Sequence, residues 1–192
     1  KSNPEGNATD TFMVTYSLAD ISQQKAGRYT TNIKYYLDRV GMPLGILATL
    51  RLEVEIEPVF NLLITPQDQK AGLEFRDLKP KEPPRISEVV IEINSNIAKR
   101  YQVNQNVYSE LTDKEGHTIP FSYFTLRMES LDTKGTLRFP EKQELKKTDA
   151  ALFVSDNAGS ADKFKLIYEL ACPKDIVAGD YSTNIIYSLI EI

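Results

Sequence analysis

The chain has 192 residues, a formal net charge of −4 and a pI near 5.2, and 41% of its residues are hydrophobic. This length and this hydrophobic share are enough to build a real core, so the chain is expected to fold. The acidic balance and the scattered Lys and Arg residues argue against a nucleic-acid partner, and no apolar run approaches the roughly 18 residues of a membrane span.

The first predicted elements lie between residues 11 and 40, and their sequence is repeated at the end of the chain. Shifting the sequence by 152 residues aligns 11–40 with 163–192 without a gap, and twelve of the thirty positions are identical. Repetition on a fixed period is typical of proteins built from duplicated modules. The segment 11–40 is therefore interpreted as the tail end of a preceding copy.

Both copies show the period-two alternation of β-strands, in "FKLIYEL" (164–170) and in "YSTNIIYSL" (181–189). The same alternation predicts strands at 11–18 and 28–38.

Two tyrosines begin equivalent strands, each shortly after a glycine: Tyr29 follows Gly27 and Tyr181 follows Gly179. Such a tyrosine suits a β-sandwich corner, where its hydroxyl bonds back to the loop backbone. It equally suits a half-buried strand position.

Short alternating segments between the two copies predict further strands, separated by Gly, Pro, Asn and Asp. They lie at 50–57, 59–65, 73–78, 86–94, 100–108, 120–131 and 136–139. Pro58 is expected to mark a bulge or a change of sheet. Only 142–154 has a helix-like composition, and one helical turn at most is expected there. The pattern predicts an all-β fold, an antiparallel Greek-key β-sandwich.

Catalysis finds no support in the sequence. The single histidine, His117, stands in a turn without a second histidine to share a metal. The single cysteine, Cys172, has no credible base nearby and cannot form an intramolecular disulfide. The sequence predicts that the chain is not an enzyme, needs no cofactor and does not depend on oxidation to fold.

The best ligand candidate is the loop "SDNAGSAD", where Asp156, Asn157, Ser160 and Asp162 could offer hard oxygen ligands to calcium. The loop departs from the EF-hand spacing and has no closing Glu. The same residue types are also what plain polar turns use. A weak calcium site and a plain loop are both kept as interpretations.

The stretch from about 48 to 192 resembles the immunoglobulin-like β-sandwich modules of bacterial surface and secreted proteins, including fimbrial subunits, coat-protein-U-like domains and the WxL class. The resemblance is carried by "SNIAKRYQVNQNVYSELTDKEGHTIPFSY", "LEFRDLKPKEPP" and "AGDYSTNIIYSL". The chain lacks the tryptophan of the WxL pattern and the disulfide of many fimbrial subunits. The resemblance therefore implies an architecture, an immunoglobulin-like sandwich, rather than one family.

Together these observations divide the chain into a strand pair of a preceding repeat at 1–42, packed on or exchanged with the main body, and a complete module at 48–192. The expected function is a non-catalytic structural or adhesion module of a repeat array, extracellular, at the cell surface or in the periplasm of a bacterium. Its partners would be neighbouring modules or further copies of itself. The alternative is a glycan- or calcium-binding accessory module of a larger secreted protein.

Overall fold

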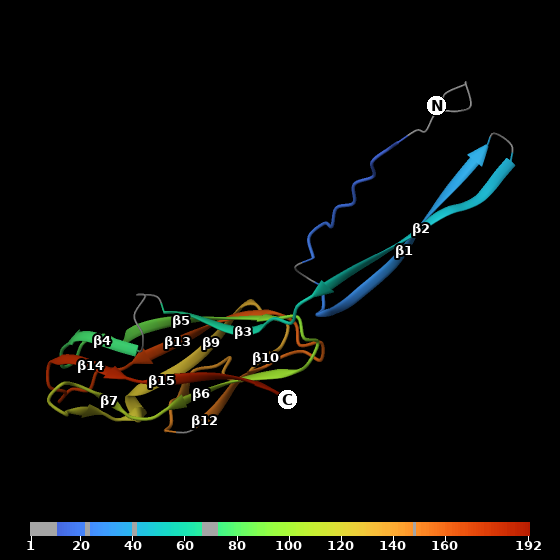
Figure 1. Ribbon diagram of the computed structural model, residues 1–192. Coiled ribbons are helices and arrows are strands. Elements are labelled where there is room, and N and C mark those ends of the chain that lie inside the picture. Colours follow the sequence, from blue (N-terminus) through green and yellow to red (C-terminus); the bar gives the residue numbers. More distant parts are fainter. Residues whose placement is uncertain (1–10, 22–23, 40–41, 67–72, 148) are drawn as a thin grey trace.

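The structure is a computed structural model, and it describes residues 11–21, 24–39, 42–66, 73–147 and 149–192. It consists of a β-sandwich and a long β-hairpin that extends away from one end of it (Figure 1). All strand pairs in the described part of the chain are antiparallel. The predicted all-β class and the antiparallel sheets are confirmed.

The strands follow one another with short connections. They are β1 (Gly27–Arg39), β2 (Met42–Ile56), β3 (Phe60–Pro66), β4 (Leu73–Leu78), β5 (Arg85–Ser95), β6 (Tyr101–Val107), β7 (Leu111–Thr112), β8 (Thr118–Ile119), β9 (Phe124–Asp132), β10 (Thr136–Leu137), β11 (Gln143–Glu144), β12 (Asp149–Val154), β13 (Asp162–Leu170), β14 (Gly179–Thr183) and β15 (Ile185–Glu191). A single 3-10 turn at Phe121–Tyr123 precedes β9.

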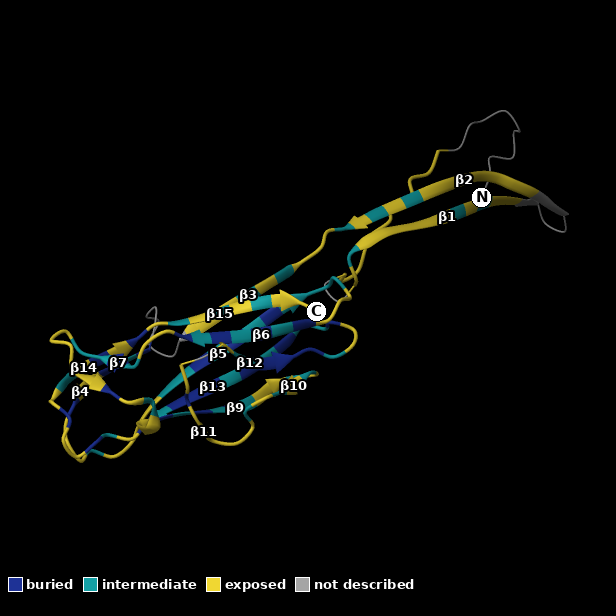
Figure 2. Cartoon of the chain, turned by 90° about the horizontal axis from the view of Figure 1, so that it is seen from below, coloured by how far each residue is buried: buried dark blue, intermediate teal, exposed yellow. Residues whose placement is uncertain are grey.

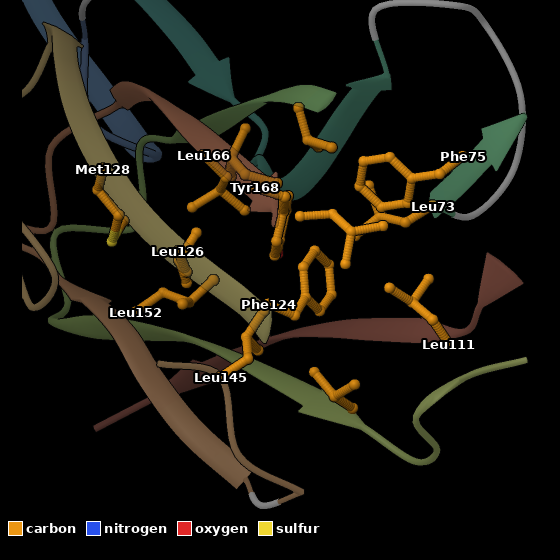
Figure 3. Close-up of a cluster of buried hydrophobic side chains, with 14 of the residues drawn as sticks. Leu73, Phe75, Leu111, Phe124, Leu126, Met128, Leu145, Leu152, Leu166 and Tyr168 are labelled. Atoms are coloured by element: carbon orange, nitrogen blue, oxygen red, sulfur yellow. The ribbon is translucent and has the colours of Figure 1, made fainter. Parts of the chain in front are cut away.

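Two sheets enclose the core of the sandwich. One has the strand order β11-β9-β13-β5-β3 and the other the order β10-β12-β6-β15, while β4-β14-β7-β8 form a third sheet at the end far from the hairpin (Figure 1). Aromatic rings connect the layers: the Phe153 and Phe164 ring centroids lie 5.0 Å apart, and those of Phe60 and Tyr101 lie 5.7 Å apart. Figure 3 shows Phe124 and Tyr168 surrounded by buried leucines of several strands.

Alternation explains why these segments pair as they do. In β6, every second residue from Tyr101 to Val107 is buried, and β13 buries Phe164, Leu166, Tyr168 and Leu170 in the same alternation, with Ile167 buried as well. The polar residues between them face solvent, where lysines of β13 pair with glutamates of β5: Lys163 with Glu92 and Lys165 with Glu88. Antiparallel sandwiches are built from strands with one solvent-exposed polar face and one buried apolar face.

The hairpin of β1 and β2 forms a separate two-stranded sheet, in which Tyr29 lies opposite Val54 and Ile33 opposite Leu50. Most of its residues are exposed, in contrast to the strands of the sandwich (Figure 2). β2 runs through the boundary expected between 42 and 48, and residues 1–10, 22–23 and 40–41 of the predicted N-terminal unit lie outside the described residues.

One local prediction was wrong. The segment 11–18 was expected to be a strand, but residues 11–20 are not in any strand of the structure. In the segment 142–154 one helical turn at most was expected. Its described residues form β11 and β12 instead, because Leu152 and Phe153 are fully buried and β12 pairs with β6. Tertiary burial therefore overrides the helix-like composition of that segment. The expected change of sheet at Pro58 is confirmed, since β2 and β3 belong to different sheets.

Candidate functional site

The two sequence copies make the same hydrogen bond at the start of their strands. The Tyr29 hydroxyl donates to the carbonyl of Lys25 at 2.8 Å, and the Tyr181 hydroxyl donates to the carbonyl of Val177 at 2.9 Å. Donor and acceptor are four residues apart in both cases, and the two bonds are 152 residues apart. Each is the bond of a tyrosine corner. Tyr181 is buried in the sandwich, whereas 43% of Tyr29 is exposed.

The two glycines before these tyrosines differ. Gly27 has φ of +149°, which residues with side chains rarely adopt, whereas Gly179 has no positive φ. A Cβ atom at either position would meet nothing within 4 Å among the described residues. Packing therefore does not require a glycine at position 179.

A second contact is also repeated, between tyrosine hydroxyls. In the sandwich, the hydroxyls of Tyr168 on β13 and Tyr187 on β15 lie 2.8 Å apart, and the Tyr168 hydroxyl donates to Oε1 of Gln105 at 2.8 Å. In the N-terminal copy, the equivalent hydroxyls of Tyr16 and Tyr35 are hydrogen-bonded. Tyr16 therefore contacts β1 as Tyr168 of β13 contacts β15, although residues 11–20 do not form a strand. Burial raises the pKa of both Tyr168 and Tyr187.

Asn96, which follows β5, joins the base of the hairpin to the sandwich. Its side-chain amide donates to the carbonyl of Glu57 at 3.0 Å, and its Oδ1 accepts from the amide of Val59 at 2.7 Å. Its backbone carbonyl accepts from Ala26 at 2.9 Å, and its backbone amide donates to Val59 at 3.1 Å. Ala26 directly precedes β1, and Glu57 directly follows β2. These four bonds, called the Asn96 joint below, hold both strands of the hairpin at their base.

A pocket of about 430 Å³ lies beside the Asn96 joint. Lys25 and Val59 line it from the hairpin side, and Lys134, Gly159 and Ser160 line it from the sandwich. The pocket is thus formed where the N-terminal copy meets the loop predicted as a calcium candidate.

Both carboxylates of that loop accept hydrogen bonds from donors within the chain. Asp156 accepts the amide of Ser160 at 2.9 Å and its hydroxyl at 2.8 Å. Asp162 accepts the Tyr101 hydroxyl at 2.8 Å and the amides of Lys134 and Gly135 at 2.5 and 3.3 Å. Each carboxylate therefore stabilises the local chain conformation.

The burial of the three candidate ligands differs as well. Asp162 is 3% exposed, and this burial raises its pKa despite the hydrogen bonds that it accepts. Burial would also raise the pKa of Asp156, but the hydrogen bonds from Ser160 outweigh it and lower that pKa. Asn157 lies exposed at the turn. The charge of Asp156 contributes to the raised pKa of Asp162, so these two carboxylates lie near each other.

The backbone of this loop depends on Gly159. Its φ is +61°, and a Cβ atom there would lie 1.9 Å from the carbonyl oxygen of Lys99. The close approach lets Ser95 donate its hydroxyl to the Gly159 carbonyl at 2.8 Å. A glycine is therefore required here both by conformation and by space.

His117 and Cys172 occupy structural positions. The ring Nδ1 of His117 lies 2.7 Å from Oδ2 of Asp113, whose other oxygen accepts two backbone amides of the same turn. Cys172 is partly buried against the core, and this burial raises the pKa of its thiol. A raised pKa reduces the share of the nucleophilic thiolate.

Sequence reasoning did not find Asn96, Gln105 or the structural role of Asp162. Alternation places Gln105 on the inward face of its strand, but nothing in the pattern names its partner. Asn96 lies in an irregular segment, so only the three-dimensional contacts show its position between hairpin and sandwich.

Within the described ranges, no three His, Cys, Asp or Glu side chains are grouped so that they could hold a metal ion. None of the described segments forms a helix long and apolar enough to cross a membrane. Comparisons with protein-family models, with curated proteins and with solved structures found no match.

Proposed function

We propose that the chain is a non-catalytic structural or adhesion module of a repeat array, whose neighbouring modules are joined end to end. The observation that carries the proposal is the recurrence of the same contacts 152 residues apart: the corners of Tyr29 and Tyr181, and the pairs Tyr16–Tyr35 and Tyr168–Tyr187. A solenoid-like array is built from units that each contact their neighbours. The N-terminal copy would be the end of one such unit.

The strand order supports an immunoglobulin-like assignment. In such domains one sheet has the order A-B-E-D, and strand C pairs with strand F in the other. The order β3-β5-β13-β9 and the pair β6–β15 correspond to these strands. A tyrosine corner stands at the start of strand F in immunoglobulin domains, and Tyr181 stands shortly before β15. β12 is then an additional strand on the far side of β6.

The Asn96 joint supports a stiff rather than a tethered connection. Four hydrogen bonds at one residue hold both β1 and β2, and β2 leads into β3 after only three residues, 57–59. A flexible linker would need a longer segment without such bonds. A stiff spacer or adhesive stalk requires this kind of connection between modules.

The resemblance to bacterial surface modules supports a location of the proposed array outside the cytoplasm, at a bacterial surface, in the periplasm or in a secreted protein. Its partners would be neighbouring modules or further copies of the chain.

The test measures the stiffness of the joint. Spin labels are attached at Tyr36→Cys on β1 and Lys147→Cys on the sandwich, in a Cys172→Ser background, and the distance distribution is measured by pulsed electron resonance. A narrow distribution is expected for the unmodified joint. Asn96→Ala should broaden it, because both side-chain bonds to the β2–β3 connection are lost.

Asn94→Ala is the matched control, since Asn94 bonds to Asn61 within the sandwich and not to the hairpin. A broad distribution in the unmodified chain would contradict a stiff array. A glycan array, run with and without calcium, tests the accessory-module alternative, and saturable binding there would favour it.

A further inference from the structure

A pocket lies between the two sheets of the sandwich, beside the connection from β10 to β11, and is called the interlayer pocket below. Its volume is about 230 Å³. The connection crosses from one sheet to the other there, because β10 pairs with β12 whereas β11 pairs with β9. All residues that line the pocket lie between positions 105 and 150, within the body of the sandwich. The pocket is therefore a feature of the sandwich itself and does not involve the hairpin.

The inner wall of the interlayer pocket is mainly apolar. Leu126 of β9 and Leu145 belong to the buried core, and Phe139 packs against that core. Figure 3 shows Leu126 and Leu145 within the cluster of buried side chains. Ala150 of β12 also lines the pocket, and its small side chain leaves space free. An apolar cavity of about 150 Å³ is enough to bind benzene, so this pocket has room for a substituted benzene ring.

One polar side chain reaches the pocket from the core. Gln105 of β6 is 3% exposed, and its Oε1 accepts the Tyr168 hydroxyl at 2.8 Å. Its Nε2 carries two further donors, and none of the described residues accepts a hydrogen bond from it. Every fully buried side-chain nitrogen or oxygen in the described ranges has a partner, so this Nε2 is not sealed inside the core. Because Gln105 lines the pocket, we conclude that its free donors point into it.

The exposed side of the pocket carries no net charge. Glu144 and Lys146 stand there with opposite charges, on either side of the buried Leu145. A charged ligand would lose its hydration shell on entering the apolar interior, and no unopposed charge would compensate for that loss. The pocket therefore favours a neutral ligand.

We propose that the interlayer pocket binds a small neutral aromatic molecule that carries one hydrogen-bond acceptor, such as a phenol. The ring would pack against Leu126 and Phe139, and its oxygen would accept a hydrogen bond from Nε2 of Gln105. A ring without such an oxygen would cover the Gln105 donors and leave them without a partner, which weakens binding. This binding site goes beyond the proposed array and does not depend on it.

The test titrates two probes, p-cresol and toluene, into the full chain. They differ only in the hydroxyl group, and the side-chain amide signals of Gln105 are followed by NMR. p-Cresol should shift these signals saturably, with an affinity on the order of tenfold higher than that of toluene. A titration to about 10 mM covers the dissociation constant of about 1 mM that is reasonable for so small a ligand.

A matched pair of variants locates the binding. Ala150 lies opposite Gln105 in the strand register, and Ala151 lies opposite Asn104, on the other face of the sheet. Ala150→Leu should fill the pocket and weaken p-cresol binding by about tenfold or more, whereas Ala151→Leu should leave it unchanged. Thermal unfolding without ligand checks that both variants are folded.

Three results would each overturn the inference: no saturable shift with p-cresol, equal affinities for the two probes, or equal binding by the two variants. The stiffness of the Asn96 joint does not depend on this pocket, so such a failure would leave the array proposal standing.

Discussion

Tyr168 and Tyr187 connect the two sheets of the sandwich through hydroxyl groups that lie 2.8 Å apart. Tyr168 also donates to the buried side chain of Gln105, so its hydroxyl satisfies two partners. We predict that Tyr168→Phe lowers the free energy of unfolding by about 2 kcal/mol, because it leaves the Gln105 oxygen buried without a donor. Tyr187→Phe should cost less, about 1 kcal/mol. Urea denaturation measures both, and equal losses would contradict the proposed order of donors.

The buried tyrosines predict a loss of stability in alkali. Burial raises the pKa of Tyr101, Tyr168, Tyr181 and Tyr187 above the ordinary value of a tyrosine. The unfolded chain therefore releases protons first as the pH rises. Tyrosine ionisation therefore leaves the free energy of unfolding unchanged below about pH 10. Above that pH it lowers the free energy of unfolding by up to about 1.4 kcal/mol per pH unit for each such tyrosine.

This effect is measured by denaturation between about pH 8 and pH 11, a window that brackets the ordinary tyrosine pKa. Tyrosinate absorbance follows the ionisation of the tyrosines. The double variant Tyr168→Phe and Tyr187→Phe should show a shallower decline. Ionisation of all ten tyrosines at the ordinary tyrosine pKa in the folded protein would contradict the prediction.

The same tyrosine-to-carbonyl hydrogen bond is expected to contribute differently to stability at the two tyrosine corners. Tyr181 is 1% exposed and Tyr29 is 43% exposed. Tyr181→Phe should lower the free energy of unfolding by about 1 kcal/mol, because its removal leaves the Val177 carbonyl without a donor in a partly buried site. Tyr29→Phe should change it by less than about 0.5 kcal/mol, since water replaces the lost donor. Thermal unfolding of the two variants compares them directly, and a larger loss for Tyr29→Phe would be the contrary result.

Asp162 is predicted to stabilise the fold through its own hydrogen bonds. Asp162→Ala should cost about 3 kcal/mol, because the Tyr101 hydroxyl and two backbone amides lose their acceptor. Asn157→Ala, at the exposed turn, is the matched control and should be neutral. Both losses are measured by thermal unfolding with and without calcium. A calcium-dependent rise in melting temperature that disappears in both variants would instead support a calcium site.

Much of the fold could be predicted from alternation and from the repeat. The pattern in 164–170 predicts the strand β13, and the aligned copies alone predict that Tyr29 and Tyr181 stand at equivalent strand starts. Alternation specifies which face of a segment is apolar, but it does not specify a pairing partner. Residues 11–18 alternate like 163–170 and yet do not form a strand, whereas 142–154 forms strands because burial of Leu152 and Phe153 outweighs local propensity.

The joint between hairpin and sandwich could not be predicted at all. Asn96 acts through four hydrogen bonds to Ala26, Glu57 and Val59, which are distant in sequence and irregular in pattern. Asp162 is a candidate from the sequence because its oxygen atoms suit a cation. The sequence does not indicate that Tyr101 and a turn at 134–135 already use those oxygens.

The outer face of the five-stranded sheet limits one way in which copies of the chain could associate. It carries alternating charges, with Lys163 beside Glu92, Lys165 beside Glu88 and Lys142 beside Glu169. Pressing two such faces together would remove water from charges that already have partners, which is costly. Lateral packing of copies through these charged pairs is therefore disfavoured.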